Sequence, residues 1–312
     1  MEAIEVSNKE YMSTFTAPYH VFNTASFNEL NSYKCENVWY LLFKDSKTRL
    51  GLILGQNGDM AMSPFSAPFG SFSFLTHDLH QQHIDEALVL LDNYLLSKSL
   101  RAIKMTLPPL CYDNLFLPKL VNSLNRHGYR NSSVELNYIF QTCLCDHCYE
   151  NILHRNAKKN MHVSLKQNFQ FKKTTDIKSA YEVIAINREA KGFPLRMTLE
   201  QIEKTIEIIN CDAFVVEFEQ NFIAAAIVFH VAKDIVQVIY WGDIPAYSPM
   251  RTMNFLSYKI FEYYKNTGIR VVDIGPSTEN GIPNFGLCEF KESIGCSVEL
   301  KFVYEKTFVA FS

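Results

Sequence analysis

The sequence feature that most constrains the fold is an order of elements that occurs twice along the chain. In the first half, strand-like segments at 37–44, 49–56 and 59–65 carry apolar and aromatic residues and are separated by turn-forming dipeptides. A helix is predicted over 80–97, where apolar residues recur at helical spacing. A strand at 101–107 follows, and two prolines stop it.

The second half has the same order, beginning about 170 residues later. Strands are predicted at 211–219, 221–232 and 235–243, followed by a helix over about 250–266 and a strand at 269–275 that stops at a proline. Each series is an antiparallel meander followed by a helix and a further strand. Its presence in both halves predicts two α+β domains of one type.

Four more helices and one strand are predicted around these two series. The helices are expected over 115–126, 149–162, 177–193 and 198–210, and the strand over 132–145. The last of these helices has the clearest start, because Thr198 can cap it and Gln201 follows three residues later.

The composition is that of a chain that forms a hydrophobic core. Its 312 residues are 47% hydrophobic and 20% charged, and charged residues interrupt the longest apolar region, 213–232. The net charge of −3 argues against general attraction to nucleic acid or anionic membranes. The acidic N-terminus lacks a signal-peptide pattern, and eight cysteines are too few for a disulfide scaffold, so we expect reduced cysteines and a cytoplasmic location.

One segment has the residue types of a zinc site without its spacing. The residues concerned are Cys143, Cys145, His147, Cys148 and His154. There is only one close cysteine pair, and Cys143 and Cys145 fall on one face of a predicted strand. We therefore expect small core residues here and no metal site in the chain.

A glycine-rich segment follows the last strand of the second series. Residues 273–296 hold four of the twelve glycines, which lets the backbone approach a ligand closely. Ser277, Thr278 and Asn284 offer hydroxyl and amide groups for substrate binding there. In the first half a stiff aromatic segment lies at the corresponding position, so Phe69 could line an acceptor pocket or belong to a packed turn.

Three short motifs in the second half resemble those of FemAB-type transferases. They are the basic helix "HRNAKKNMH" (154–162), the strand end "VVDIG" (271–275) and "FKESIG" (290–295). The last resembles the F-K-x-x-F-G signature, with Ile294 in place of the second phenylalanine. In this order the motifs resemble the FemAB-like branch of the GNAT acyltransferase superfamily.

The resemblance implies tandem GNAT-like domains, each a mixed, largely antiparallel sheet flanked by helices. This agrees with the duplicated order of elements. We expect a degenerate N-terminal domain at 1–145, on the acceptor side, and a C-terminal domain at 146–312 that carries the transfer site. The motif match covers the second half, whereas the first half matches in layout only.

The resemblance also implies where transfer would occur, because two neighbouring strands of a GNAT-like sheet splay apart around the reacting groups. Asp243 or Asp273 could take a proton from an attacking amine, and Tyr240 could return one. Trp241 would lie near the substrate. The alternatives are a turn cap for Asp243 and simple packing for Trp241. Lys291, in the F-K motif, would contact a phosphate or carbonyl oxygen of a substrate, or pair with a carboxylate.

The expected donor site differs from that of an acetyl-CoA enzyme. No glycine lies between Gly242 and Gly268, so the glycine cradle that holds a pyrophosphate at the helix start is missing. Ser248 could still begin this helix and bind a phosphate together with Arg251. A basic stretch at 151–175, with six lysines and arginines and no acidic residue, could bind tRNA or form a solvated helix and strand edge. Its candidate phosphate-binding residues are Arg155, Lys158 and Lys159.

Together these features predict an N-acyltransferase or aminoacyltransferase that moves an acyl group from an activated donor to an amine acceptor. By resemblance the donor is an aminoacyl-tRNA or an acyl-CoA, used as a co-substrate, with no tightly bound cofactor. The alternative is a non-catalytic scaffold of the same fold that binds tRNA or a phosphorylated metabolite. The chain has no G-x-S-x-G motif, which argues against a serine hydrolase. The sequence names neither the acceptor nor the oligomeric state.

Overall fold

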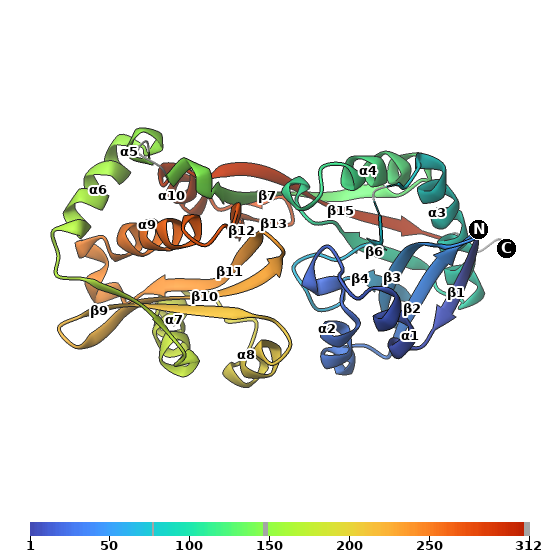
Figure 1. Cartoon of the computed structure of the whole chain (residues 1–312), viewed down its shortest axis with the longest axis horizontal. Helices are drawn as coiled ribbons and strands as arrows, with labels where there is room; N and C mark the ends of the chain where they lie inside the picture. Colours follow the sequence, from blue (N-terminus) through green and yellow to red (C-terminus); the bar gives the residue numbers. More distant parts are fainter. Residues whose placement is uncertain (77, 146–148, 309–312) are drawn as a thin grey trace. The chain divides into compact units, whose positions relative to one another are not determined.

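The computed structural model describes residues 1–76, 78–145 and 149–308, and it divides into two compact units (Figure 1). Unit 1 contains residues 1–136 and the residues from 299 onward, and unit 2 contains residues 137–298. The expected division was at 145/146, with the C-terminus in the second domain. The observed division differs because two strands continue across the boundary, and the last strand of the chain pairs inside unit 1.

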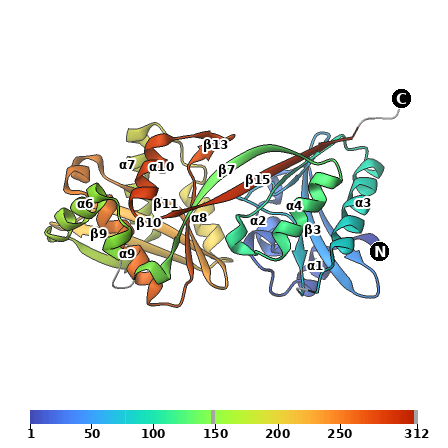
Figure 2. The same cartoon turned by 90° about the horizontal axis from the view of Figure 1, so that it is seen from above.

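Unit 1 is a mixed sheet with helices on both faces. Its strands are β1 (Glu2–Val6), β2 (Asn37–Lys44), β3 (Thr48–Asn57), β4 (Met60–Ser63), β5 (Ser73–Phe74), β6 (Ala102–Thr106), β7 (Arg130–Gln141) and β15 (Ser297–Thr307). The order is β1-β2-β3-β4-β6-β15-β7, with β5 on β3. Its helices are α1 (Asn8–Thr14), α2 (Ala25–Leu30), α3 (Gln81–Ser97) and α4 (Phe116–Arg126). Figure 2 shows the long strands β7 and β15 side by side.

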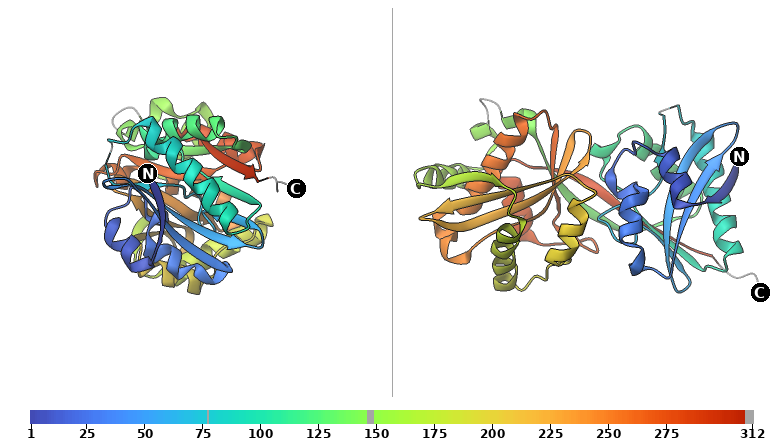
Figure 3. Two further views of the ribbon diagram at one scale, coloured as in Figure 1. Left: turned by 90° about the vertical axis from the view of Figure 1, so that its right-hand side faces the viewer. Right: turned by 60° about the horizontal axis from the view of Figure 1, so that its bottom comes forward.

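Alternating side chains along β2 and β3 supply both cores of unit 1. Leu41 and Leu52 lie in the larger core, which α3 and α4 cover with leucines such as Leu88. Tyr40 and Leu42 point to the opposite face, where α1 and α2 pack. In the right view of Figure 3 these two helices, in blue, lie on the unit 1 sheet. The three predicted strands and the helix of the first series are confirmed.

Unit 2 repeats the architecture around a second series of strands. These are β8 (Gln170–Thr174), β9 (Cys211–Phe218), β10 (Asn221–Ala232), β11 (Ile235–Asp243) and β12 (Val271–Pro276), in the order β7-β12-β11-β10-β9-β8, with a small hairpin of β13 (Thr278–Glu279) and β14 (Ile282–Pro283). The helices are α5 (Tyr149–Ile152), α6 (Arg155–Leu165), α7 (Ile177–Lys191), α8 (Leu199–Ile206), α9 (Thr252–Lys265) and α10 (Phe285–Ser293). β9, β10 and β11 form the predicted antiparallel meander, and β11 pairs with β12 in parallel.

Two helices cover opposite faces of the unit 2 sheet (Figure 1). The predicted helix over 177–193 is α7, which packs on β10 and β11. The buried alanines 224–226 of β10 leave room for this close contact. On the other face lies α9, where Phe261 stacks on Phe140 of β7 with ring centroids 3.8 Å apart. Within the described residues, no helix combines the length and apolar character needed to cross a bilayer.

Three predicted boundaries are wrong in detail. The helix expected over 149–162 is two helices, α5 and α6, because the chain is extended at His154. The strand expected to reach 145 ends at Gln141 and continues as a short 3-10 turn. Ser248 does not begin the helix of the second series, which starts at Thr252 after Arg251 adopts a left-handed conformation with φ of 65°. The capping box of Thr198 and Gln201 at the start of α8 is confirmed.

Candidate functional site

The candidate site lies in unit 2, where the parallel strands β11 and β12 separate. They pair at only three positions, from Ile235 opposite Val271 to Gln237 opposite Asp273. Beyond these positions β11 stays paired with β10 as far as Asp243, whereas β12 turns away. We call the opening that begins at Gln237 and Asp273 the wedge. Backbone groups of β11 beyond this point are not taken up by pairing with β12, so they can serve a ligand.

Asp273 stands at the apex of the wedge and is fully buried. One of its oxygens accepts hydrogen bonds from the amide of Asn137 at 2.8 Å and from the backbone N–H of Gly275 at 2.8 Å. The other accepts from the amide of Gln237 at 2.9 Å. With three donors around it, this carboxylate holds the apex together and sets the turn at the end of β12.

Lys291, the lysine of the F-K motif, is buried beside this apex. Its side chain comes from α10 and is 2% exposed. The ammonium donates to the backbone carbonyls of Gly275 at 2.8 Å and Pro276 at 3.0 Å, and lies 5.3 Å from the ring centre of Tyr138. Burial lowers the pKa of Lys291 to about 8, against attraction from Asp273 and two cysteines that acts to raise it. Two of the three ammonium hydrogens are used by these bonds, so one remains for a substrate oxygen.

Arg188 is a second, partly buried cation in this region, and sequence reasoning missed it. It lies on α7, with its guanidinium 6.0 Å from the ring centre of Tyr240 on β11. Its pKa is lowered by burial. Among the residues that the structure describes, no carboxylate forms an ion pair with Arg188, and its Nε is buried without a hydrogen-bond partner. A partly buried guanidinium that forms no ion pair and has an unpartnered Nε is free to bind an anionic group of a ligand.

Two further polar atoms of the wedge are buried and have no partner among the described residues. They are Oε1 of Gln237 and Oγ of Ser277. Ser277 is one of the predicted substrate-binding residues, and it follows directly on β12. Buried polar atoms in native proteins are almost always hydrogen-bonded, so unfilled ones beside a strand opening indicate a place for substrate or water.

The glycine-rich segment forms the edge of the wedge. After Ser277 it folds into the β13–β14 hairpin, which begins at Thr278 and turns through Asn280 and Gly281, both at positive φ. Asn284 is exposed and caps α10, because its side chain accepts from the backbone N–H of Leu287 at 3.1 Å. Asn284 therefore orients the helix that carries the F-K lysine. Its predicted contact with substrate, and that of Thr278, stay predictions.

Asp243 is held inside a local network at the far end of β11. It is 3% exposed, and its oxygens accept from Asn187 at 3.2 Å, from Ser248 at 2.8 Å and from Thr252. Asn187 also donates to the backbone carbonyl of Asp243 at 2.6 Å. These contacts fix the connection from β11 to α9, which matches the turn-cap alternative. The proposed proton transfer by Asp243 stays a prediction, as does phosphate binding by Ser248.

Tyr240 and Trp241 lie on opposite faces of β11. The hydroxyl of Tyr240 accepts from the backbone N–H of Met197 at 3.1 Å, and burial is the main cause that raises its pKa. The Arg188 guanidinium lies over the ring of Tyr240, so the clearest role of Tyr240 is to position that cation. Trp241 is half-buried and packs edge-on against Phe290 of α10, with ring centroids 6.2 Å apart.

The predicted phosphate-binding lysines and arginines are spread over two places. Arg155, Lys158 and Lys159 lie on α6, where Lys158 pairs with Glu150 at 2.9 Å. Arg251 is exposed just before α9. The basic stretch contains the helix α6 and the edge strand β8, an arrangement that both alternatives share. Binding of tRNA by these residues stays a prediction.

Two other predictions concern residues outside the wedge. Phe69, in unit 1, is 1% exposed and packs edge-on against His20, Phe22 and Tyr112, so the packed-turn alternative describes it. His147 and Cys148 lie outside the described residues, and among the residues that the structure does describe no group of three or more metal-ligating side chains comes together.

The fold is shared with solved structures of low sequence identity. FemX matches with a TM-score of 0.71, at 11% identity, over 99% of this chain and 98% of that one. The C-terminal domain of a putative lysylphosphatidylglycerol synthetase from Agrobacterium fabrum matches with a TM-score of 0.63, at 11% identity, over 97% and 93% of the two chains. A tandem GNAT protein from the clavulanic acid biosynthesis pathway matches with a TM-score of 0.58, at 9% identity, over 98% of each chain. No family model and no curated protein sequence matches the chain. The tandem GNAT-like fold and the structural resemblance to FemX are therefore confirmed.

Proposed function

We propose that this chain, which has the fold of FemX and of tandem GNAT proteins, is an acyltransferase that works in the wedge of unit 2. It would move an acyl or aminoacyl group from an activated donor to an amine acceptor. The observation that carries the proposal is a pair of cations, the buried Lys291 and the partly buried Arg188, beside strands that separate. Among the described residues neither cation forms an ion pair with a carboxylate, although Asp273 lies near enough to Lys291 to act on its pKa.

The two cations can serve the two negative charges of such a reaction. When the amine nitrogen attacks the acyl carbonyl, the carbonyl oxygen becomes an oxyanion, which the free N–H of Lys291 and the unpaired backbone of β11 can stabilise. The bond from the carbonyl carbon to the leaving oxygen or sulfur then breaks, and the proton lost by the amine ends on the leaving group. Arg188 can hold a phosphate of the donor or acceptor, because a guanidinium suits phosphate geometry.

Asp273 acts in this scheme as a positioning residue. Both of its oxygens already accept hydrogen bonds, so it holds Gln237 and the turn at Gly275 where the substrate needs them. This turn also supplies the Gly275 carbonyl, which accepts a hydrogen bond from Lys291. This arrangement makes the geometry of the lysine depend on the buried carboxylate.

We favour an aminoacyl-tRNA as the donor over an acyl-CoA. The helix after β11 begins at a residue in the left-handed conformation, and there is no glycine in the connection to form a pyrophosphate cradle. The exposed cations Arg155, Lys159 and Arg251 could then contact the tRNA backbone. If they do, the affinity for tRNA falls steeply as salt rises.

The test is a transfer assay with two donor classes, charged tRNA and acyl-CoA, against a panel of amines. We expect Arg188→Gln to weaken binding of the phosphate-bearing substrate by at least about tenfold, since a charge-assisted hydrogen bond contributes about 1.5–3 kcal/mol. The matched control is Arg196→Gln, which removes a charge from the nearby exposed pair with Glu279 and should leave binding unchanged. Equal effects of the two substitutions would contradict the assignment of the wedge.

The non-catalytic alternative has its own signature in the same assay. Each carboxylate oxygen of Asp243 and Asp273 already accepts at least one hydrogen bond, so neither residue offers a free base. If the wild-type chain binds charged tRNA or a phosphorylated metabolite, and Arg188→Gln abolishes this binding, but no donor is consumed, the wedge is a binding site and transfer is refuted.

A further inference from the structure

A pocket lies in unit 2 at the opposite end of the sheet from the wedge. It is lined by residues of β8, β9, β10 and the end of α9, and has a volume of about 330 Å³. His230, at the end of β10, lies next to the start of β11, whereas the wedge opens toward the other end of β11. The two sites can therefore be occupied at the same time. None of the wedge residues lines this pocket.

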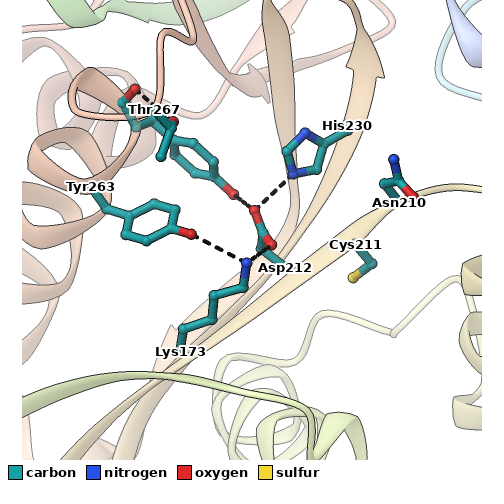
Figure 4. Close-up of a pocket in the computed structure, with 8 residues that line it drawn as sticks. Lys173, Asn210, Cys211, Asp212, His230, Tyr263 and Thr267 are labelled. Carbon is teal, nitrogen blue, oxygen red and sulfur yellow. Dashed lines mark hydrogen bonds and ion pairs between the residues drawn. The ribbon is translucent and has the colours of Figure 1, made fainter.

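A buried carboxylate organises the pocket. Asp212 is 5% exposed and accepts from His230 Nε2 at 2.8 Å, from the Tyr264 hydroxyl at 2.8 Å and from Lys173 Nζ at 2.5 Å. These hydrogen bonds hold its pKa well below the ordinary value, against desolvation, which is the largest single effect and acts to raise it. Figure 4 shows Lys173 and His230 converging on this carboxylate.

Lys173 and Tyr263 keep hydrogen-bond donors for a ligand. Both oxygens of Asp212 are occupied, so the carboxylate has little capacity for a ligand's donor. The Lys173 ammonium uses two hydrogens, one for Asp212 and one for the Tyr263 hydroxyl at 3.2 Å, and keeps the third. Because Tyr263 accepts from Lys173, its own O–H can point elsewhere.

The solvent exposure of the Lys173 and His230 side chains distinguishes this cluster from a purely structural network. The carboxylate is buried, but the side chains of Lys173 and His230 are 50% and 33% exposed and line the pocket. A lysine held in place by a buried carboxylate and an aromatic hydroxyl loses little further freedom when it binds a ligand. A pre-oriented cation with free donors beside it suits an acidic group.

We propose that this pocket binds a small metabolite through a carboxylate or phosphate group, which is held by Lys173 and Tyr263. Asp212 is a positioning residue: it orients the lysine and the imidazole without contacting the ligand. Asn210 and Thr267, which also line the pocket, can contact the rest of the ligand. This site is separate from the transfer site proposed above and does not depend on it.

The test is a calorimetric titration of the full chain with two probes, inorganic phosphate and acetate, at constant ionic strength. Lys173→Met should weaken binding of the preferred probe at least about tenfold, the effect of losing one charge-assisted hydrogen bond. The matched control is Lys172→Met. Lys172 lies on the same strand, its side chain is 45% exposed and it pairs with Glu217 outside the pocket, so this substitution removes the same charge and should leave affinity unchanged.

Two further variants keep the result interpretable. Lys173→Met deprives Asp212 of a partner, so Tyr263→Phe, which leaves all three donors of Asp212 in place, is the second variant and should weaken binding by about two- to tenfold. Because the wedge also carries cations, the titration is repeated in Arg188→Gln, where binding in the pocket should persist.

Each outcome decides the proposal. A preference for phosphate or for acetate supports the site and identifies the acidic group. Binding that Lys173→Met and Lys172→Met weaken equally, binding that Arg188→Gln abolishes, or no saturable binding of either probe overturns it.

Discussion

The substitution Lys291→Met distinguishes a catalytic role of the F-K lysine from a structural one. Methionine keeps the length and apolar stem of lysine but removes the charge and its hydrogen bonds to Gly275 and Pro276. If the lysine serves the reaction, the substitution should remove activity without unfolding the chain. If it mainly holds α10 against the end of β12, stability should fall with activity.

The structure sets the size of the stability change. Lowering the pKa of Lys291 from 10.5 to about 8 corresponds to about 3 kcal/mol that disfavours the charged form in the folded protein. Removing the charge recovers this free energy, whereas leaving the two carbonyls without their donor costs about 1–3 kcal/mol each when they stay buried. These effects largely offset each other, so we expect the free energy of unfolding at pH 7 to fall by no more than about 3 kcal/mol. Loss of the oxyanion donor should lower kcat by about 10²–10³-fold.

The pH dependence provides an independent check. Between pH 8 and 10.5 the unfolded lysine keeps its proton and the folded one loses it, so this group makes stability rise with pH over that window. The difference in unfolding free energy between wild type and Lys291→Met, measured by urea denaturation, should therefore shift in favour of wild type from pH 8 to pH 10. A loss of more than about 3 kcal/mol at pH 7, with a pH-independent difference, would refute the reasoning.

Three further substitutions test other parts of unit 2. Asp212→Asn should lower the free energy of unfolding at pH 7. The difference from wild type should shrink below about pH 4, because a carboxylate with a lowered pKa loses its contribution to stability as it is protonated. Acid unfolding of both proteins, followed by circular dichroism, measures this difference. Gly242→Ala places a Cβ 2.7 Å from Cγ of Asn187, displaces Asn187 from Asp243 and should cost about 1–3 kcal/mol in urea denaturation. Thr198→Ala should cost about 1 kcal/mol by loss of the α8 cap, and Thr198→Ser should restore it.

Local sequence patterns were sufficient for most of the element order. Alternating and helical spacing of apolar residues identified the two strand series and their helices, since side chains on strands and helices repeat with fixed periods. Turn residues and the box of Thr198 and Gln201 marked boundaries for the same local reason. Lys291 was found through a motif, and its burial next to β12 agrees with a site there.

The sequence by itself determined the repeated α+β layout, the absence of a glycine cradle before α9 and the short motif that contains Lys291. Only the tertiary structure decided which strands separate, which charged residues form no ion pair and which strand the last strand of the chain pairs with. Arg188 has no local signal, because its isolation depends on α7 packing over β11. The Asp212 pocket joins side chains from four elements distant in sequence, and β15 pairs with β6 across most of the chain. Such long-range contacts depend on the whole core, which no local pattern encodes.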